Sequence, residues 1–430
     1  MRTLGTIKLK KRTQPEWLIW LIVVMPFLFG TFFELLRLPS LFKYLLDAAN
    51  LLLILYLVLK IRFTSVLDKK LKGPLAWIIV LVALTFFAYV AQYQSILYYL
   101  WGLRNNYRYY VLFFAVALFL DQNDIDHYFS LLDKVFWVNA VVSLAQYFLL
   151  GINGDHLGGL FGAERGCNTY TNMFFVVITA KTVVNYLNKQ EELASGLTKI
   201  AVMLVVAALA ELKFFYIEFL LIVVMAVLMT NFSWRKVLVL IGGLGGTMVG
   251  AYILTLLFPN STGFLSIEGI LNIAASKRGY TSSGDLNRLT AIPIISERFL
   301  KTFPQKLFGL GLGNCDTSNY HFLSTPFYGK YSYLNYLRFS IASIFLETGY
   351  LGLGMFFGFF VLVIWKIARM KKYTVMDTCY GQIAILVAVC CMMITFYNST
   401  LRMEAGYMLY FILALPFVKA GNMQSEELSE

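Results

Sequence analysis

Residues 74–92 read PLAWIIVLVALTFFAYVAQ and include no charged side chain. A helix needs about 20 predominantly apolar residues to cross the hydrocarbon core of a bilayer, so this run predicts a transmembrane helix. Similar runs recur along the chain and give twelve candidate spans: residues 17–37, 41–61, 74–92, 106–121, 135–151, 170–188, 198–211, 213–231, 236–258, 340–365, 379–397 and 403–419. The sequence therefore predicts an all-α polytopic integral membrane protein, folded as a single transmembrane domain over residues 1–430.

The composition agrees with this fold class. Of the 430 residues, 59% are hydrophobic and only 14% are charged, and the mean hydropathy is +0.68. A soluble domain carries about 25% charged residues, so the soluble class is excluded. Aromatic residues reach 17%, as expected of a chain with aromatic belts at both membrane interfaces.

Basic residues predict the orientation of the spans, because loops rich in Lys and Arg stay in the cytoplasm. They gather before the first span and in every second connection: residues 2–12, 60–72, 189–199, 235–236 and 366–372. We therefore expect a multi-pass protein with both termini in the cytoplasm. The net charge of +12 is spread over separate loops, which argues against a nucleic-acid partner.

This orientation places three connections outside: residues 152–169, the turn at 211–213, and residues 259–339. Connections longer than about 15 residues are usually functional or disordered, and the third is far longer than that. It contains aromatic and apolar residues, so we expect this long extracytoplasmic loop to fold against the membrane.

Arg288 marks a candidate anion site in the long loop. Apolar residues at helical spacing predict an amphipathic helix over residues 286–302, kinked at Pro293. Arg288 would lie in its first turn, where the helix dipole favours an anion and the guanidinium adds a bidentate fork. A phosphate site is one interpretation, and an arginine solvated on the loop surface is the other.

The glycine-rich run FGLGLGN at residues 308–314 lies farther along the same loop. It lacks the Gly-Lys-Ser/Thr of a phosphate-binding P-loop and opens no Rossmann unit. A tight turn is therefore favoured over a phosphate contact for these glycines.

Two charged residues belong to the tenth span. Glu347 lies inside it, where an ionisable side chain is a functional candidate by default. A structural ion pair between helices is the alternative. Arg338 marks the outer edge of the span, either as a ligand or as an interfacial anchor.

Further cations share the external side. Arg165 lies between glycines in the 152–169 loop, and Lys213 lies beside Glu211, with which it could simply pair. The remaining external or interfacial arginines are Arg104, Arg108, Arg278 and Arg402. So many cations on one face suggest an anionic, phosphorylated substrate that approaches from outside.

Histidines and cysteines are few. The three histidines and five cysteines show no metal-binding spacing, so no metal site is expected. His321 is external, either as a solvated loop residue or as a catalytic base. Cys167 and Cys315 are both external, and either a disulfide or two free thiols fits the sequence.

Three segments, in this order and spacing, resemble the O-antigen ligase and polymerase superfamily, especially the Wzy-type polymerases of bacterial O-antigen, capsule and exopolysaccharide. They are Gly159-Leu160-Phe161-Gly162 with Thr171-Asn172, then Asn287-Arg288-Leu289 with residues 307–313, and then FLETGYLG at residues 345–352. Ligases of this superfamily often place His-Asn ahead of the Glu of the third segment. Arg338 stands there in this chain, which favours the polymerases.

The resemblance implies a GT-C-like glycosyltransferase in the bacterial cytoplasmic membrane that works without a cofactor or metal. A hydroxyl of one polyprenyl-diphosphate-linked oligosaccharide would attack the anomeric carbon of another, and polyprenyl diphosphate would leave. The lipid bilayer, the lipid-linked donor and acceptor, a chain-length regulator and a flippase are the partners that this activity implies.

The expected site follows from the resemblance and from the residue chemistry together. Arg165 and Arg288 are the leading diphosphate ligands, because arginines can stabilise the charge that builds on the leaving group. Glu347 is the candidate base on the acceptor hydroxyl, or it orients an arginine. Further candidates for substrate binding are Arg338, Arg278, Lys213, Asn172 and His321.

Two other functions stay open from the sequence. One is an O-antigen ligase that transfers the glycan to a different acceptor. The other is a non-enzymatic flippase or transporter of lipid-linked oligosaccharides, although such proteins usually contain repeated halves with broken helices, which we do not find in this sequence.

Overall fold

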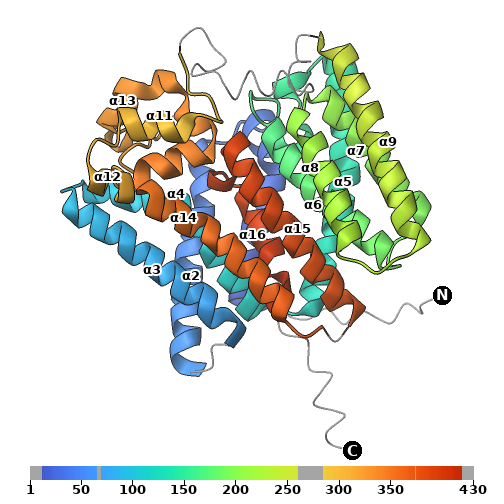
Figure 1. Cartoon of the computed structure of the whole chain (residues 1–430), viewed down its shortest axis with the longest axis horizontal. Coiled ribbons are helices and arrows are strands. Elements are labelled where there is room, and N and C mark those ends of the chain that lie inside the picture. The colour runs from blue at the N-terminus through green and yellow to red at the C-terminus, as the bar shows by residue number, and fades with distance from the viewer. Residues whose placement is uncertain (1–11, 65–68, 260–283, 373, 419–430) are drawn as a thin grey trace, which may run out of the picture.

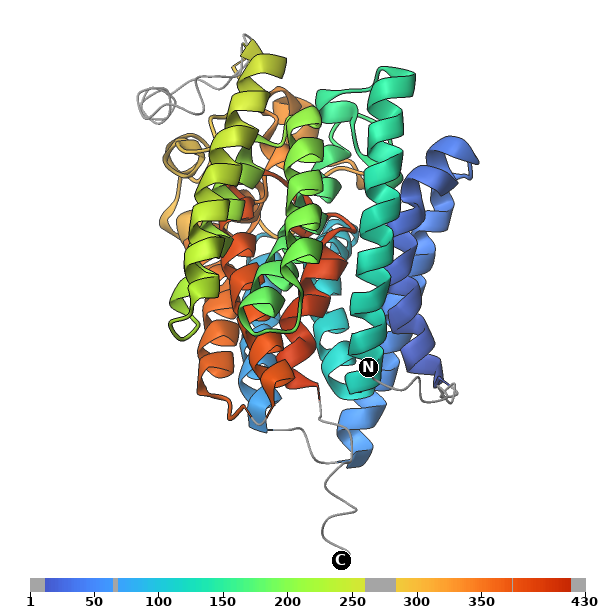
Figure 2. The same ribbon diagram turned by 90° about the vertical axis from the view of Figure 1, so that its right-hand side faces the viewer.

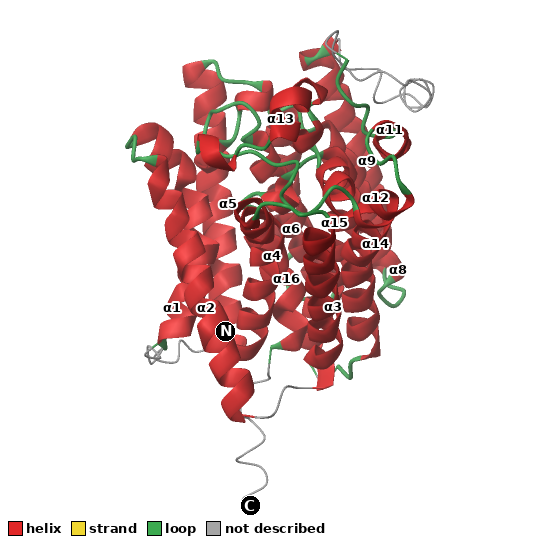
Figure 3. Ribbon diagram, turned by 90° about the vertical axis from the view of Figure 1, so that its left-hand side faces the viewer, coloured by secondary structure: helices red, strands yellow, loops and turns green. Residues whose placement is uncertain are grey.

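The structure of the chain is a computed structural model, in which residues 12–64, 69–259, 284–372 and 374–418 are described. Within these residues each of the twelve apolar runs overlaps an α-helix, and no strand is present (Figure 3). The twelve helices are α1 (Gln14–Val24), α2 (Leu45–Thr64), α3 (Lys69–Ala91), α4 (Ile96–Phe119), α5 (Gln122–Leu150), α6 (Asn168–Leu187), α7 (Leu193–Leu209), α8 (Lys213–Leu228), α9 (Trp234–Leu257), α14 (Ser340–Arg369), α15 (Val375–Tyr397) and α16 (Gly406–Ala414).

Six segments of the described chain are long and apolar enough to cross a membrane. They are Ser40–Arg62, Lys69–Ala91, Gln122–Leu150, Trp234–Leu257, Ser340–Arg369 and Val375–Tyr397. Shorter apolar helices occur at Gln14–Leu28, Leu193–Leu209 and Gly406–Phe417. The prediction of an all-helical protein suited to a membrane is therefore confirmed.

The helices form a bundle with a buried centre and a largely apolar outer surface. α15 and α16 run through the middle, α7 to α9 form one side, and α2 and α3 form the other (Figure 1). The apolar stretch of α15 is 72% buried, whereas that of α9 is only 17% buried, and α9 lies on the surface of the bundle (Figure 2). The exposed residues of α9 are nevertheless apolar, as a helix in contact with lipid requires.

Helix ends follow local sequence signals. α5 begins with a capping box. The Asp121 side chain accepts a hydrogen bond from the Asp124 N–H group, and the Asp124 side chain accepts one from the Asp121 N–H group. The same helix ends at Gly151, whose φ of 68° lies in the left-handed region that glycine tolerates best. α15 begins with an equivalent box formed by Thr374 and Asp377.

α14 is broken at Gly349, where φ is 63° and ψ is −161°. The glycine-rich turn packs against this break: the Leu310 N–H group donates to the Leu346 carbonyl at 2.7 Å, and the Gly311 N–H group donates to the Glu347 carbonyl at 3.0 Å. A Cβ on Gly309 would collide with the backbone of residues 347–348. These glycines therefore serve close backbone contact, as the tight-turn interpretation predicted.

Three short helices, α11 (Ala291–Arg298), α12 (Phe303–Phe308) and α13 (Pro326–Tyr331), lie together at one end of the bundle (Figure 1). α11 is shorter than the helix predicted over residues 286–302, because it begins only at Ala291. Arg288 therefore lies in the turn before the helix, and its expected place in the first helical turn was wrong. Pro293 falls in the first turn of α11, where proline is tolerated without a kink.

Gly349→Ala should destabilise the protein, because an L-residue at a φ of 63° costs about 1–2 kcal/mol. Its Cβ would also collide with the backbone of residues 306–309. The matched control is Gly354→Ala in the same helix, where a Cβ meets nothing within 4 Å. Thermal unfolding in detergent should show a lower melting temperature for the first variant alone, and equal melting of both would contradict the docking of the turn onto α14.

Candidate functional site

An open cleft lies at the end of the bundle that carries α11 to α13. It is bounded by the 152–169 loop, by the first residues of α6 and α8, and by the segment that joins α15 to α16. Arg288 and Arg338, which lie on either side of α11 to α13 in the sequence, also line it. The segment between α1 and α2 contributes the rest of the lining: Phe29, Phe33, Glu34 and Lys43. We call this space the cleft.

The loop that carries Arg165 is held in place by α5. The Gln146 side chain binds the backbone of Gly159 through two hydrogen bonds. The Gly159 N–H group donates to the Gln146 amide oxygen at 2.7 Å, and the Gln146 amide nitrogen donates to the Gly159 carbonyl at 3.0 Å. Glu34 accepts the N–H groups of Ala163 at 2.5 Å and Glu164 at 3.2 Å. These contacts fix the backbone on both sides of the turn before α6.

Three predicted arginines meet in the cleft although they come from distant parts of the chain. Arg165 is 72% exposed and lies 3.8 Å from the Asp155 carboxylate. The guanidinium carbon of Arg288 lies 4.9 Å from the centre of the Tyr397 ring. Arg338 is exposed and has no ion-pair partner among the described residues. The cleft thus presents guanidinium groups that solvent or a ligand can reach.

Acidic residues also line the cleft, but several of them are engaged by the protein. The Glu211 carboxylate pairs with Lys213 at 2.9 Å, and Glu34 accepts backbone N–H groups as described. The carboxylates of Asp155 and Glu164 are exposed beside Arg165. The cleft therefore combines cations with hydrogen-bond acceptors.

Two further candidates lie in or beside the cleft and have protein partners. Asn172 lines the cleft, is 2% exposed, and donates to the buried Glu218 carboxylate at 2.8 Å. Lys213 forms an ion pair with Glu211, as the alternative to a ligand-binding role predicted. It does not line the cleft.

The remaining candidates are not brought to the cleft. Glu347 is 1% exposed and does not line it; its nearest cation is Arg402, at 3.9 Å. His321 is exposed on a short turn, His321–Leu323, outside the lining. Arg278 lies outside the described residues. Cys167 and Cys315 are both free, buried thiols, so they form no disulfide with each other.

A set of buried charges adjoins the cleft, and we call it the charge network. Its members are Asp47, Arg104, Arg108, Asp316, Glu347, Arg402 and Glu404. At one end, Arg402 pairs with Asp316 at 2.7 Å, and Asp316 also accepts a hydrogen bond from Asn105 at 2.6 Å. Glu347 contacts the same guanidinium group.

At the other end of the network, Arg104 binds Asp47 through two nitrogens, at 3.0 and 2.8 Å. Arg108 joins Asp47 at 3.6 Å to Glu404 at 3.2 Å. The Tyr170 hydroxyl donates to Glu404 at 2.9 Å, and both of these residues line the cleft. The Arg108 guanidinium also donates to the main-chain carbonyl of Arg402 at 3.2 Å, which joins the two ends, so the network extends from the buried Glu347 to the wall of the cleft.

Glu404 is the member that the sequence did not reveal as a site residue. Burial alone would raise the pKa of its carboxyl group, but the guanidinium groups of Arg108 and Arg104 outweigh burial and lower this pKa to about 2. A carboxylate with so low a pKa is a weak base, so Glu404 is suited to hold Arg108 and Tyr170 in place. The sequence signal was a carboxylate two residues after Arg402, at the second position of the last apolar run.

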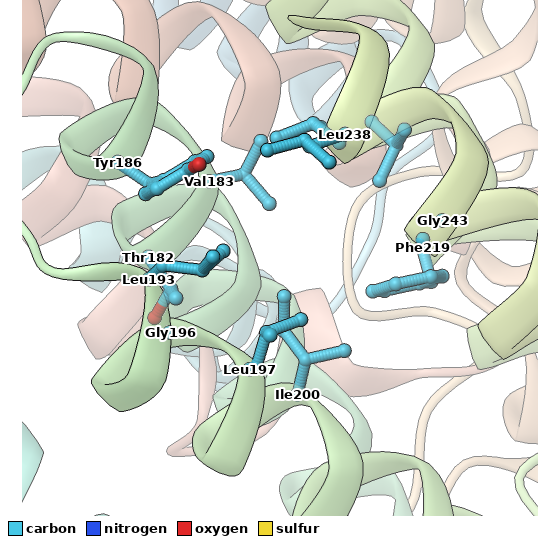
Figure 4. Close-up of a pocket in the computed structure, with 13 residues that line it drawn as sticks. Thr182, Val183, Tyr186, Leu193, Gly196, Leu197, Ile200, Phe219, Leu238 and Gly243 are labelled. Atoms are coloured by element: carbon cyan, nitrogen blue, oxygen red, sulfur yellow. The ribbon is translucent and has the colours of Figure 1, made fainter. Parts of the chain in front are cut away.

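A second, smaller cavity lies between α6, α7, α8 and α9 (Figure 4). Leu193, Leu197 and Ile200 of α7 face Phe219 of α8 across it, and Gly243 of α9 leaves room at its edge. No charged side chain of the described chain lines this cavity. It therefore offers burial to an apolar group but no charge chemistry.

Arg402→Gln should destabilise the protein strongly, because it leaves the buried Asp316 and Glu347 carboxylates without their guanidinium partner. Breaking a buried ion pair in this way costs about 3–5 kcal/mol. Adding Asp316→Asn should recover part of the loss. Asp155→Asn, which breaks the exposed pair with Arg165, is the control and should cost at most about 1 kcal/mol. Thermal unfolding in detergent measures all four proteins, and an Arg402 variant as stable as the control would refute the role of the network.

Comparison of the chain with protein-family models gives no match, and comparison with curated proteins gives none. No group of three or more His, Cys, Asp or Glu residues in the described part of the chain is arranged to share a metal ion. The function is therefore inferred below from the cleft, the charge network and the motifs that resemble the polymerases.

Proposed function

We propose that this chain is a membrane glycosyltransferase that polymerises polyprenyl-diphosphate-linked oligosaccharide repeat units, as a Wzy-type member of the O-antigen ligase and polymerase superfamily. In this proposal each of the twelve helices α1–α9 and α14–α16 spans the bacterial cytoplasmic membrane. Both termini lie in the cytoplasm, and the cleft opens at the outer face.

The observation that carries the proposal is the meeting of Arg165, Arg288 and Arg338 in one cleft. Guanidinium groups bind phosphate oxygens bidentately and keep their charge at every physiological pH. Three of them from distant segments suit an extended diphosphate better than a single small anion. Arg288 belongs to one of the segments that resemble the superfamily, and Arg165 lies between the two parts of another.

The reaction needs charge stabilisation on the leaving group. The acceptor hydroxyl oxygen forms a bond to the anomeric carbon of the donor, and the bond from that carbon to the diphosphate oxygen breaks. Negative charge then builds on the polyprenyl diphosphate, where the arginines of the cleft stabilise it. The hydroxyl proton passes to a carboxylate that lines the cleft, and the transfer requires neither metal nor nucleotide.

The rest of the lining suits a sugar chain. Asp155 and Glu164 present exposed carboxylate oxygens, which accept hydrogen bonds from sugar hydroxyls. Phe161 and Tyr170 lie in the same wall with their rings stacked at 5.8 Å. Glu347 acts at a distance in this proposal, because it holds Arg402 in the charge network and does not reach the cleft.

Purified protein incubated with one lipid-linked repeat unit should produce a ladder of glycan lengths on a gel, in a chelating buffer as well as in the presence of Mg²⁺. A ladder forms because each product is again a donor. A single transfer to a different lipid acceptor would identify a ligase. If no product forms and the substrate instead crosses the membrane of a vesicle, the chain is a transporter and the enzymatic proposal is wrong.

Arg288→Ala and Arg165→Ala should each lower the rate of ladder formation by about 10²–10³, as loss of a donor that stabilises transition-state charge does. Arg288→Lys should retain part of the rate, because lysine keeps the charge but loses the bidentate fork. Lys301→Ala is the matched control, since Lys301 is an exposed cation of the same loop outside the cleft. Melting curves check the folding of each variant, and full activity of both alanine variants would contradict the diphosphate assignment.

A further inference from the structure

An apolar groove lies on the outer surface of the bundle between α8 and α15. It is shallow and open to the surroundings, and it is lined by Phe214 of α8 and by Val389, Met392, Met393 and Phe396 of α15. All five side chains are partly or fully accessible, and none is charged. α8 and α15 lie on the face of the bundle that is turned toward the viewer in Figure 1.

The groove adjoins the cleft through Phe214, whose side chain belongs to the lining of both. The Phe214 ring is stacked on the Tyr397 ring, with 4.5 Å between the ring centres and 7° between the ring planes. The guanidinium carbon of Arg288 lies 4.9 Å from the centre of the same Tyr397 ring. A cation and an apolar groove are thus separated by two stacked aromatic rings.

We propose that the α8–α15 groove holds the isoprenoid chain of the lipid-linked substrate, next to its diphosphate, while the diphosphate lies in the cleft at Arg288. The identity of the headgroup rests on the proposed function. Beyond that function, the groove specifies where the isoprenoid chain lies and from which side of the bundle the lipid enters.

Three properties of the groove select this occupant. It meets the cleft at Phe214, whose ring is stacked on the Tyr397 ring beside Arg288, so one amphiphile can place its chain in the groove and its charge at Arg288. Methionine side chains are flexible and polarisable, which suits an irregular branched chain. The groove also lies on the outer surface of the bundle, where a chain can leave it into the hydrocarbon of the bilayer.

The apolar cavity between α6 and α9 does not share these properties. Its lining has no residue in common with the cleft, and none of its described lining residues is charged. A chain bound there would have no cation for its headgroup, so the α8–α15 groove is the better match to an anionic lipid.

The test uses a polyprenyl diphosphate that carries a diazirine in the isoprene unit next to the diphosphate. The full-length protein, in vesicles, is irradiated with this lipid and digested, and the labelled peptides are identified by mass spectrometry. We expect labels on residues 389–396 and at Phe214, and excess unlabelled polyprenyl diphosphate should remove them. Met393→Trp, which fills the groove, should lower the labelling about tenfold, equivalent to about 1.4 kcal/mol of binding.

Val361→Trp is the matched control, because Val361 is an apolar residue of α14 that is 55% exposed and lies outside the groove. It should leave the labelling unchanged. Labels confined to another surface would overturn the proposal. So would equal labelling of the groove by a phospholipid that carries the same diazirine and is not displaced by polyprenyl diphosphate.

The ladder assay on the same preparations separates the two proposals. A ladder of glycan products without labels in the groove would support the polymerase activity and refute the proposed lipid site. Labels in the groove that excess polyprenyl diphosphate removes, without any glycan product, would support the lipid site and refute the polymerase activity. Melting curves of Met393→Trp and Val361→Trp show whether a loss of labelling is due to unfolding, and a groove variant that melts like wild type yet keeps full labelling would refute the path.

Discussion

The ion pair between Arg402 and Asp316, 2.7 Å apart, holds together the segments that surround the cleft. Arg402 lies between α15 and α16, Asp316 follows the glycine-rich turn, and Asn105 of α4 donates to the same carboxylate. Both charged side chains are 8% exposed, so each one is tolerated only while the other is present. Segments that lie far apart in the sequence must therefore assemble together, because none of them can bury its own charge alone.

The backbone contact at the break in α14 makes this pairing possible. The glycine-rich turn lies against residues 346–349 through two main-chain hydrogen bonds, and only residues without a side chain permit the approach on both sides. The turn then leads directly to Asp316 and places its carboxylate beside Arg402. Glu347 belongs to the same break, which explains how an ionisable residue inside a span finds a cation at 3.9 Å.

The sequence predicted the helices well because a long apolar run in a membrane must satisfy its backbone hydrogen bonds internally, and an α-helix does so within one segment. It predicted α4 to begin ten residues too late, at 106 in place of Ile96, because polar residues near its outer end interrupt the apolar pattern. It also selected Arg165, Arg288 and Arg338, which share the cleft, by their predicted external position, and Arg288 by its motif as well. It could not reveal that Glu404 completes the charge network, since that contact depends on how helices distant in sequence pack.

The structure divides the arginines that were predicted to be external into two groups, which differ in whether they can bind a ligand. Arg104, Arg108 and Arg402 are matched by the four carboxylates of the charge network, so they have no positive charge to spare for a ligand. In the cleft, Arg165 is 72% exposed and its neighbour Asp155 is exposed as well, so water screens their contact and a ligand can replace it. Arg338 is exposed too. An excess of cations on one face is thus no guide to a binding site by itself. The exposure of each guanidinium group and the burial of its partner decide which cations hold the fold together and which ones can meet an anion.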